Sequence, residues 1–168
     1  MKKLLLIIFP LLFHSAGISQ NRVNVNNLVL YGDKYFKEND DRPFNGIVFD
    51  MSKETDNKIL KYNIVDGLKN GLYQEWYPDG KPKSKGKYLN NKRVHNWTSW
   101  YENGQKSGIV TYKDGIANGL HALWSQSGTK YYEATFKDEK LDGFAYAIGK
   151  FRPSDLKEFK LNEWALSL

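Results

Sequence analysis

The sequence contains no cysteine among its 168 residues. This absence excludes a disulfide framework, a thiolate metal site and a catalytic thiol. It also excludes a lipoprotein anchor at a signal cleavage site, because that anchor needs a cysteine. The fold must therefore be held together by packing and hydrogen bonds alone.

Sequence signatures of enzymes are absent as well. There is no Gly-x-Ser-x-Gly nucleophile motif and no phosphate-binding loop. His14 lies in the apolar leader, and no Asp or Glu accompanies both His95 and His121 at a repeated offset. Most carboxylates fall at turns, and no pair at hydrolase spacing can be inferred. The sequence predicts a protein that is not an enzyme and has no metal or cofactor.

The sequence also lacks a large excess of charge of one sign. The formal net charge is +6, and Lys2 and Lys3 of the leader account for two of these charges. The remaining basic residues are interleaved with Asp and Glu and lie mostly beside turns and on strands. Solvated sheet edges usually carry lysine, so this pattern argues against a nucleic-acid partner.

What the sequence does contain is a 24-residue unit that recurs three times between residues 64 and 144. Chance composition does not keep several columns at one period, so the unit indicates a repeat protein. The columns are Trp76, Trp100 and Trp124; the turn glycines Gly80, Gly104 and Gly128; Ile64, Tyr88, Tyr112 and Phe136; and Gly71, His95, Gly119 and Gly143.

Each unit carries two turn signals, at alternating intervals of 13 and 11 residues. Asn or Asp followed by Gly tolerates the positive φ of a hairpin turn. The segments between turns are rich in Tyr, Trp, Thr and Val and have the length of strands. The sequence therefore predicts an all-β fold: an elongated single-layer antiparallel meander of repeated β-hairpins.

The loop Pro78-Asp79-Gly80 predicts the register of these hairpins. Pro suits the first corner of a type I turn and Gly the bulge position after it, which gives a three-residue loop. Tyr77 then pairs with Lys81, and alternation sends the Trp column and the Tyr/Phe column to the same face as one aromatic stripe. A two-residue loop would place the two columns on opposite faces.

Residues 1–19 have the pattern of a secretory signal peptide, because two lysines precede a ten-residue apolar run and small residues follow it. The alternative is an uncleaved membrane anchor, although the run is short for a permanent span. The protein is thus expected to be exported, either periplasmic or secreted. Residues 20–43 are predicted to cap the sheet, 44–148 to form the repeats, and 149–168 to be a C-terminal capping tail over the final hairpin.

The segment Asn118 to Trp124, followed by a Gly turn and by Tyr or Phe before Asp-Gly, resembles the MORN-variant repeat. Residues 28–46 are similar to the first segment of the YwqK-type antitoxin proteins, which are built from that repeat; the matching residues are Leu28-Val29, Gly32, Tyr35-Phe36, Pro43-Phe44 and Gly46. The resemblance covers roughly residues 28–147. It implies a non-enzymatic repeat protein with roles in protein interaction, including toxin neutralisation, or at membrane lipids.

Two features depart from this family pattern. His95 replaces the usual Gly at the start of the third unit, and we expect this to do no more than twist the strand. The signal peptide directs the protein out of the cytoplasm, where an antitoxin to a cytoplasmic toxin would have no target.

The aromatic columns offer two candidate surfaces. Rings one hairpin apart are separated by about 10 Å and could stack on sugars or dock an extended partner. We expect the Trp and Tyr/Phe columns to be structural, with Trp rings that stack across repeats and exclude water. The candidate partner-binding face is then the opposite one, with Tyr73, Tyr77, Trp97, Tyr101 and His121.

These features predict an exported, non-enzymatic module that binds a protein partner through one sheet face. Toxin neutralisation, as in an immunity protein, is one form that this function could take. The alternative is a cell-envelope module that binds glycan or anionic lipid through aromatic ladders and lysines. The sequence leaves the partner's identity, the binding face and the oligomeric state open.

Overall fold

The computed structural model describes residues 21–143 and 145–147 of the chain. The predicted signal peptide and the predicted C-terminal tail lie outside these residues. Within them, the chain forms thirteen strands and one short 3-10 turn, η1, and no α-helix. The strands are β1 Arg22–Asn24, β2 Leu28–Tyr31, β3 Lys34–Lys37, β4 Gly46–Met51, β5 Lys58–Val65, β6 Leu68–Trp76, β7 Pro82–Leu89, β8 Lys92–Trp100, β9 Lys106–Lys113, β10 Ile116–Trp124, β11 Lys130–Lys137, β12 Lys140–Leu141 and β13 Tyr146–Ala147; η1 spans Val25–Asn27.

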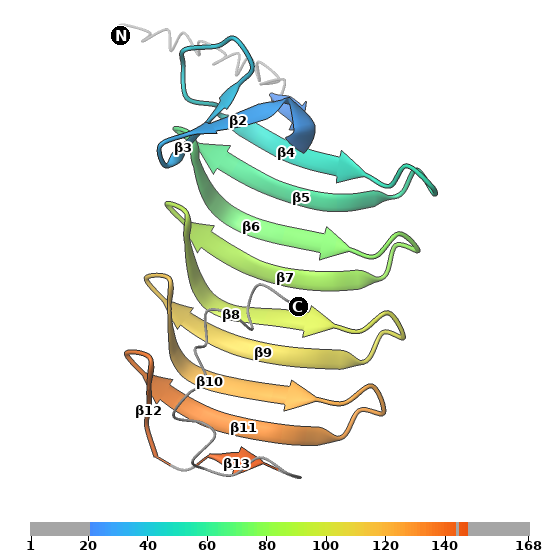
Figure 1. Ribbon diagram of the computed structural model, residues 1–168, viewed down its shortest axis with the longest axis vertical. Coiled ribbons are helices and arrows are strands. Elements are labelled where there is room, and N and C mark those ends of the chain that lie inside the picture. Colours follow the sequence, from blue (N-terminus) through green and yellow to red (C-terminus); the bar gives the residue numbers. More distant parts are fainter. Residues whose placement is uncertain (1–20, 144, 148–168) are drawn as a thin grey trace, which may run out of the picture.

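The strands from β4 to β12 form one antiparallel sheet in which each strand pairs with the next along the chain. They lie one below another along the length of the molecule (Figure 1). The prediction of an all-β meander of hairpins is confirmed. The N-terminal end adds two features: β1 pairs in parallel with β4, and β2 and β3 form a separate hairpin. The turn of that hairpin is Gly32-Asp33, and the sequence did not predict β1.

One end of the hairpins is closed by two-residue turns, which Figure 1 shows on its left side. Both residues of these turns have positive φ, for example 50° at Asp66 and 76° at Gly67. This geometry matches the right-handed twist of paired strands. The second turn residue also donates its N–H to the preceding hairpin, as from Gly115 to the Arg93 carbonyl at 2.9 Å. Successive turns are thereby tied together.

The other end is closed by the predicted three-residue loops. Tyr77 donates its N–H to the Lys81 carbonyl at 2.9 Å, and the same bond recurs from Tyr101 to Gln105 and from Ser125 to Thr129. The predicted pairing of Tyr77 with Lys81 is confirmed.

The prediction of one aromatic stripe is wrong, because a β-bulge follows each loop. Trp76 pairs with Pro82, but Glu75 pairs with Ser84, so Lys83 is an extra residue. The extra residue reverses the alternation between the two sides of the loop. Trp76 and Tyr88 therefore lie on opposite faces, and the same shift recurs at Trp100 and Trp124.

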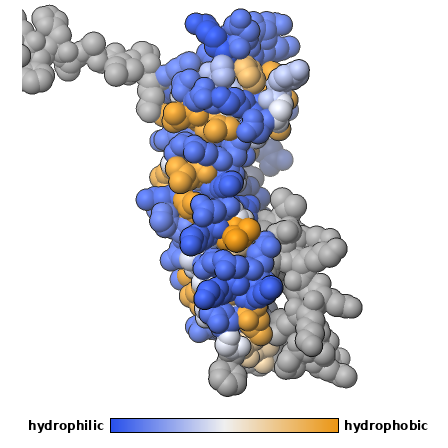
Figure 2. Space-filling model, turned by 90° about the vertical axis from the view of Figure 1, so that its left-hand side faces the viewer, coloured by the Kyte–Doolittle hydropathy of each residue, from blue (hydrophilic) through white to orange (hydrophobic). Residues whose placement is uncertain are grey.

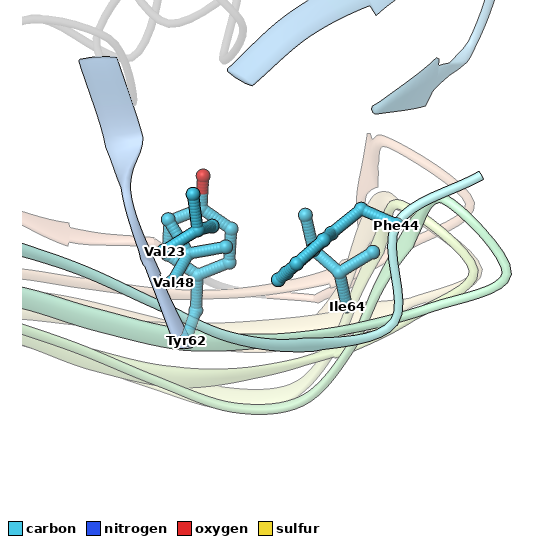
Figure 3. Close-up of a cluster of buried hydrophobic side chains, with 5 residues drawn as sticks. All are labelled: Val23, Phe44, Val48, Tyr62 and Ile64. Carbon is cyan, nitrogen blue, oxygen red and sulfur yellow. The ribbon is translucent and has the colours of Figure 1, made fainter. Parts of the chain in front are cut away.

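We name the two faces of the sheet by their aromatic residues. The inner face carries Tyr62, Tyr73 and Trp97, and the outer face carries the Trp column. A core cluster lies on the inner face near the N-terminal end, and β1 and the segment before β4 cover it (Figure 3). Its members are Val23, Phe44, Val48, Tyr62 and Ile64.

A second core cluster lies on the inner face of β10 and β11. It contains Leu123, Tyr132 and Ala134, and the partly buried side chains of Phe136 and Ala147 pack against it. Between the two clusters, the inner face of β6 to β9 is the part of the sheet where aromatic and polar side chains meet.

The bend of each hairpin lies at the Gly71 column. Gly71 and Gly119 have φ of 86° and 115°, and His95 keeps a positive φ of 59° at the same position. The substitution of His for Gly therefore preserves the local conformation. This left-handed backbone conformation costs a residue with a side chain about 1 kcal/mol.

Candidate functional site

Tyr73 and Trp97 are at the centre of an aromatic cluster on the inner face. Their ring centroids are 5.2 Å apart, and Tyr88 packs edge-on against both, at 5.6 and 4.9 Å. Tyr62 stacks on Tyr73 at 5.9 Å, and Tyr112 meets Trp97 at 6.5 Å. The rings come from β5 to β9 and form a continuous band across these strands.

Two further contacts fix the orientation of the Trp97 ring. Its indole N–H donates to the Lys87 carbonyl at 3.1 Å, and the Arg93 guanidinium lies 4.5 Å from the ring centroid. Arg93 also donates to the Tyr112 hydroxyl at 3.3 Å. Trp97 is only 7% exposed, so it acts mainly as a support for the rings around it.

Small side chains next to this band leave the inner face hollow. Ser84, Ser99 and Gly108 lie on three successive strands and help to line a hollow of about 250 Å³ beside Tyr73 and Trp97. A second hollow of about 450 Å³ shares Tyr73 with the first and extends toward the three-residue loops. We call the two together the inner groove.

An ion pair lies where the two hollows meet. Lys83 Nζ is 2.7 Å from Glu75 Oε1, and the Tyr73 hydroxyl donates to Glu75 Oε2 at 3.2 Å. Burial raises the pKa of Tyr73 far above its ordinary value, and the Glu75 charge adds to this effect. Tyr73 therefore stays a neutral hydrogen-bond donor at any physiological pH. Both side chains of the ion pair are half-buried, so the groove offers a cation and an anion at one point.

Lys69 closes the cluster toward the N-terminal end. Its ammonium lies 5.1 to 5.5 Å from the ring centroids of Tyr35, Tyr62 and Tyr88. A cation surrounded by ring faces is stabilised by their quadrupoles. Because Tyr35 belongs to β3, these contacts link the β2–β3 hairpin to the sheet.

The five residues predicted for a partner-binding face do not lie together. Tyr73, Trp97 and His121 share the inner face, but Trp97 and His121 are buried. Tyr77 and Tyr101 lie at the three-residue loops, where their hydroxyls donate to the carbonyls of Trp100 and Trp124 at 2.7 and 2.8 Å. The last two residues thus connect neighbouring hairpins, and their role in partner binding stays a prediction.

His121 is buried beside Tyr132, with ring centroids 5.2 Å apart. Its Nδ1 is shielded from solvent and has no hydrogen-bond partner among the described residues. Burial lowers the pKa of His121 to about 4. The imidazole is therefore neutral near pH 7 and packs against Tyr132 of the second core cluster.

The predicted stacking of the Trp column on itself is not what the structure shows. No ring pair among the described residues joins two of these tryptophans, because they are two strand separations, about 10 Å, apart. The Trp124 ring instead lies 5.2 Å from the Lys106 ammonium and 5.5 Å from that of Lys130. The Trp column is a half-buried outer row, and the inner face holds both core clusters.

The end of the sheet with the two-residue turns carries exposed apolar side chains at successive levels (Figure 2). Polar side chains separate them into small patches. Scattered apolar residues are normal on protein surfaces, so this edge carries no functional argument. The residues are Val65, Leu72, Leu89, Ile116 and Leu120.

The described residues contain no group of three or more His, Asp or Glu arranged to hold a metal ion. Within the same part of the chain, no helix is long and apolar enough to cross a membrane.

Glu75, Lys83, Ser84, Arg93 and Ser99 are groove residues that sequence reasoning missed. The signal that could have found them is the Pro-Asp-Gly loop itself, since a bulge often follows a three-residue loop with Gly at its end. Counting that bulge would have placed Glu75 beside Ser84 on the face of Tyr73.

Comparison with known families agrees with this architecture. The family described as MORN repeat variant matches residues 69–90 and 96–114. The matched residues run from β6 to the end of β9, the part of the sheet that carries the inner groove. No curated protein matches the chain. MORN repeats are commonly binding modules for proteins or membranes, and they are typically not enzymes.

Proposed function

We propose that the protein is an exported, non-enzymatic module that binds an extended segment of a partner protein in the inner groove. The observation that carries this proposal is the floor of small side chains, Ser84, Ser99 and Gly108, beside rings that are already fixed by packing. A preformed concave site beside fixed aromatic rings is typical of ligand binding. Fixed rings also lose little conformational entropy when a partner packs on them.

The charges around the groove favour an acidic partner segment. No Asp or Glu lies between Asp79 and Glu102, although this stretch contains five lysines and Arg93. Lys83 of β7 and Arg93 of β8 face the groove, and Lys85 and Lys87 are exposed on the other face of β7. This basic band steers acidic segments toward the sheet, and added salt weakens that attraction.

Toxin neutralisation is a finer form of the same proposal. An exported module that holds an acidic segment of a secreted toxin would fit both the predicted leader and the groove. A secreted toxin encoded beside this protein would support this form of the proposal.

The proposal is tested with two variants that place the same ring on opposite faces of the sheet. Ser84→Tyr fills the groove, whereas Leu72→Tyr places a tyrosine ring on the outer face of the neighbouring strand β6. Proteins bound from a cell-envelope extract are compared by quantitative mass spectrometry, with far-UV circular dichroism as the folding control. We expect one defined protein to bind the wild type and Leu72→Tyr but not Ser84→Tyr. Equal binding by all three proteins would refute a role for the groove.

A second candidate function rests on the Trp column. The Trp124 ring flanked by Lys106 and Lys130 offers stacking and positive charge on the outer face, as a glycan or an anionic lipid requires. Sedimentation with cell wall or with acidic vesicles tests this function. Its loss in Trp124→Ala, together with unchanged groove binding, would assign it to the outer face.

A further inference from the structure

The inner groove contains two cations with different surroundings. Lys83 Nζ is 2.7 Å from Glu75 Oε1, so its charge is compensated within the protein. Arg93 also lines the groove, but it forms no ion pair with any Asp or Glu in residues 21–143 and 145–147. Its guanidinium donates to the Tyr112 hydroxyl at 3.3 Å, and a hydroxyl does not compensate the charge as a carboxylate does. Half-buried charges are normally paired, so Arg93 is the groove cation that a ligand can pair with.

Arg93 belongs to a column of the repeat whose members differ from unit to unit. Lys69, Arg93 and Ala117 follow one another at intervals of 24 residues and have equivalent positions in their hairpins. The Lys69 ammonium is surrounded by tyrosine rings, one of which, Tyr35, comes from the β2–β3 hairpin. Ala117 is apolar and only 5% exposed. Of these three residues, only Arg93 brings a charge to the first hollow of the groove.

The Arg93 side chain is restricted before any ligand arrives. Its Cζ lies 4.5 Å from the Trp97 ring centroid and 5.5 Å from that of Tyr112. A guanidinium presents its N–H donors in a planar fork that matches the two oxygens of a carboxylate. Because the rings already limit its motion, Arg93 loses little conformational entropy when it binds.

We propose that Arg93 is the residue of the inner groove that binds a carboxylate, and that this carboxylate belongs to an Asp or Glu side chain of the partner segment. The inference rests on the proposed function and adds the residue that recognises the acidic group. It also divides the two cations by role, because Lys83 is already paired with Glu75 and Arg93 is not.

The hollow also determines which residue of the partner accompanies the acidic one. The guanidinium of Arg93 contacts the Trp97 ring, and Gly86 of β7 lies beneath that ring. Ser84, which lines the hollow with the apolar side chain of Leu123, is two residues from Gly86 along β7, or about 6.7 Å. In an extended segment lying along β7, side chains two positions apart have this same spacing. The expected recognition element is therefore an Asp or Glu two positions from a large apolar residue.

The test uses a synthetic library of short random peptides, acetylated and amidated at their ends so that only side chains carry carboxylates. Peptides are selected on the full-length wild-type protein, and those that no longer bind Ser84→Tyr are kept as groove ligands. We expect these ligands to contain the recognition element. Replacing its acidic residue by Asn or Gln should weaken binding, measured by fluorescence anisotropy, by about 10- to 100-fold.

Three variants assign that difference to one side chain. Arg93→Gln should bind the acidic peptide and its amide equally, whereas Arg93→Lys should keep part of the difference because it retains the charge without the fork. Lys85→Gln is the matched control for charge, since it removes one positive charge from the outer face of β7 and should keep most of the difference. Far-UV circular dichroism verifies the sheet, and Arg93→Lys is the second variant if Arg93→Gln does not fold.

The outcomes separate this inference from the proposed function. Groove ligands without an acidic residue, or a difference that persists in Arg93→Gln, would overturn the inference and leave the groove as a binding site. An equal loss of the difference in Lys85→Gln, or stronger binding by peptides with a free C-terminal carboxylate and no acidic side chain, would overturn it in the same way. If no selected peptide depends on Ser84, the proposed function and this inference both fail.

Discussion

Gly86→Ala should be the most disruptive single-methyl change in the aromatic band. A Cβ built at Gly86 would lie 2.2 Å from Trp97 Cδ2 and 2.3 Å from Trp97 Cε2. Carbon atoms in contact are normally about 3.5 to 4.0 Å apart, so the ring would have to move by more than 1 Å. Gly86 has no positive φ, and the added methyl itself introduces no backbone strain.

The magnitude follows from what holds the Trp97 ring. Movement would disturb three aromatic pairs, each worth about 0.5 to 1.5 kcal/mol, and the contact with Arg93. It would also weaken the indole hydrogen bond to the Lys87 carbonyl, worth about 1 kcal/mol. We expect Gly86→Ala to lower the free energy of unfolding by about 3 to 5 kcal/mol, comparable with removal of a large buried ring.

The assay is urea denaturation followed by far-UV circular dichroism, in a double-mutant cycle with Trp97→Ala. Without the indole, Gly86→Ala should be neutral or slightly stabilising, because Gly weakens a strand interior. Gly108→Ala is the matched control, since its Cβ would meet side-chain atoms of Ser99 and Leu123 at 3.1 and 3.2 Å and would be in ordinary contact with the Ala122 carbonyl oxygen at 3.7 Å. We expect it to cost less than about 1 kcal/mol. An equal cost of Gly86→Ala with and without the indole would refute the reasoning.

Three further predictions concern other positions of the repeat. His95→Gly should raise the free energy of unfolding by about 1 kcal/mol, because it removes a side chain at positive φ; a rise in melting temperature checks this, and His95→Ala should give no such gain. The pKa of His121 is lowered to about 4 in the folded protein from an ordinary value of 6.5, so the unfolded chain binds the proton first as pH falls. Stability should therefore drop by about 3 kcal/mol from pH 7 to pH 4 through this group, and His121→Phe should remove that part of the dependence in urea titrations at the two pH values. Tyr101→Phe should cost about 1 kcal/mol through loss of its bond to the Trp124 carbonyl, and an unchanged denaturation midpoint would contradict that.

The strand order could be predicted from sequence because it depends on local turn chemistry. Asp66-Gly67 and Asp114-Gly115 adopt the positive φ that their side chains tolerate, and Pro78-Asp79-Gly80 forms the expected three-residue loop. Each turn joins strands that are adjacent in the chain, so no long-range pairing had to be inferred. The meander follows from these signals alone.

The assignment of residues to faces could not be predicted in the same way. One extra residue, Lys83, is enough to exchange every side chain between the faces, and the predicted register counted the Pro-Asp-Gly loop without the bulge that follows it. The inner groove was missed for this reason. The fit of Gly86 beneath Trp97 was also out of reach, because it depends on which two residues meet across β7 and β8.

The N-terminal layer shows a third limit of sequence reasoning. β1 contains three residues and carries no turn signal, yet it pairs in parallel with β4. Such a strand is specified by the sheet that it joins and not by its own composition.

The strands at the two edges of the described sheet determine how easily another chain could add to it. Each hairpin presents to the next the same row of unpaired amides and carbonyls, so nothing within the unit limits growth of the ribbon. The borders differ from the interior: β1 has three residues, and β12 and β13 have two each. Edge strands this short offer an incoming chain few unpaired backbone groups. Short edge strands are one way in which natural sheets avoid fibril formation. The terminal segments, and not the repeat, thus set the length of the ribbon.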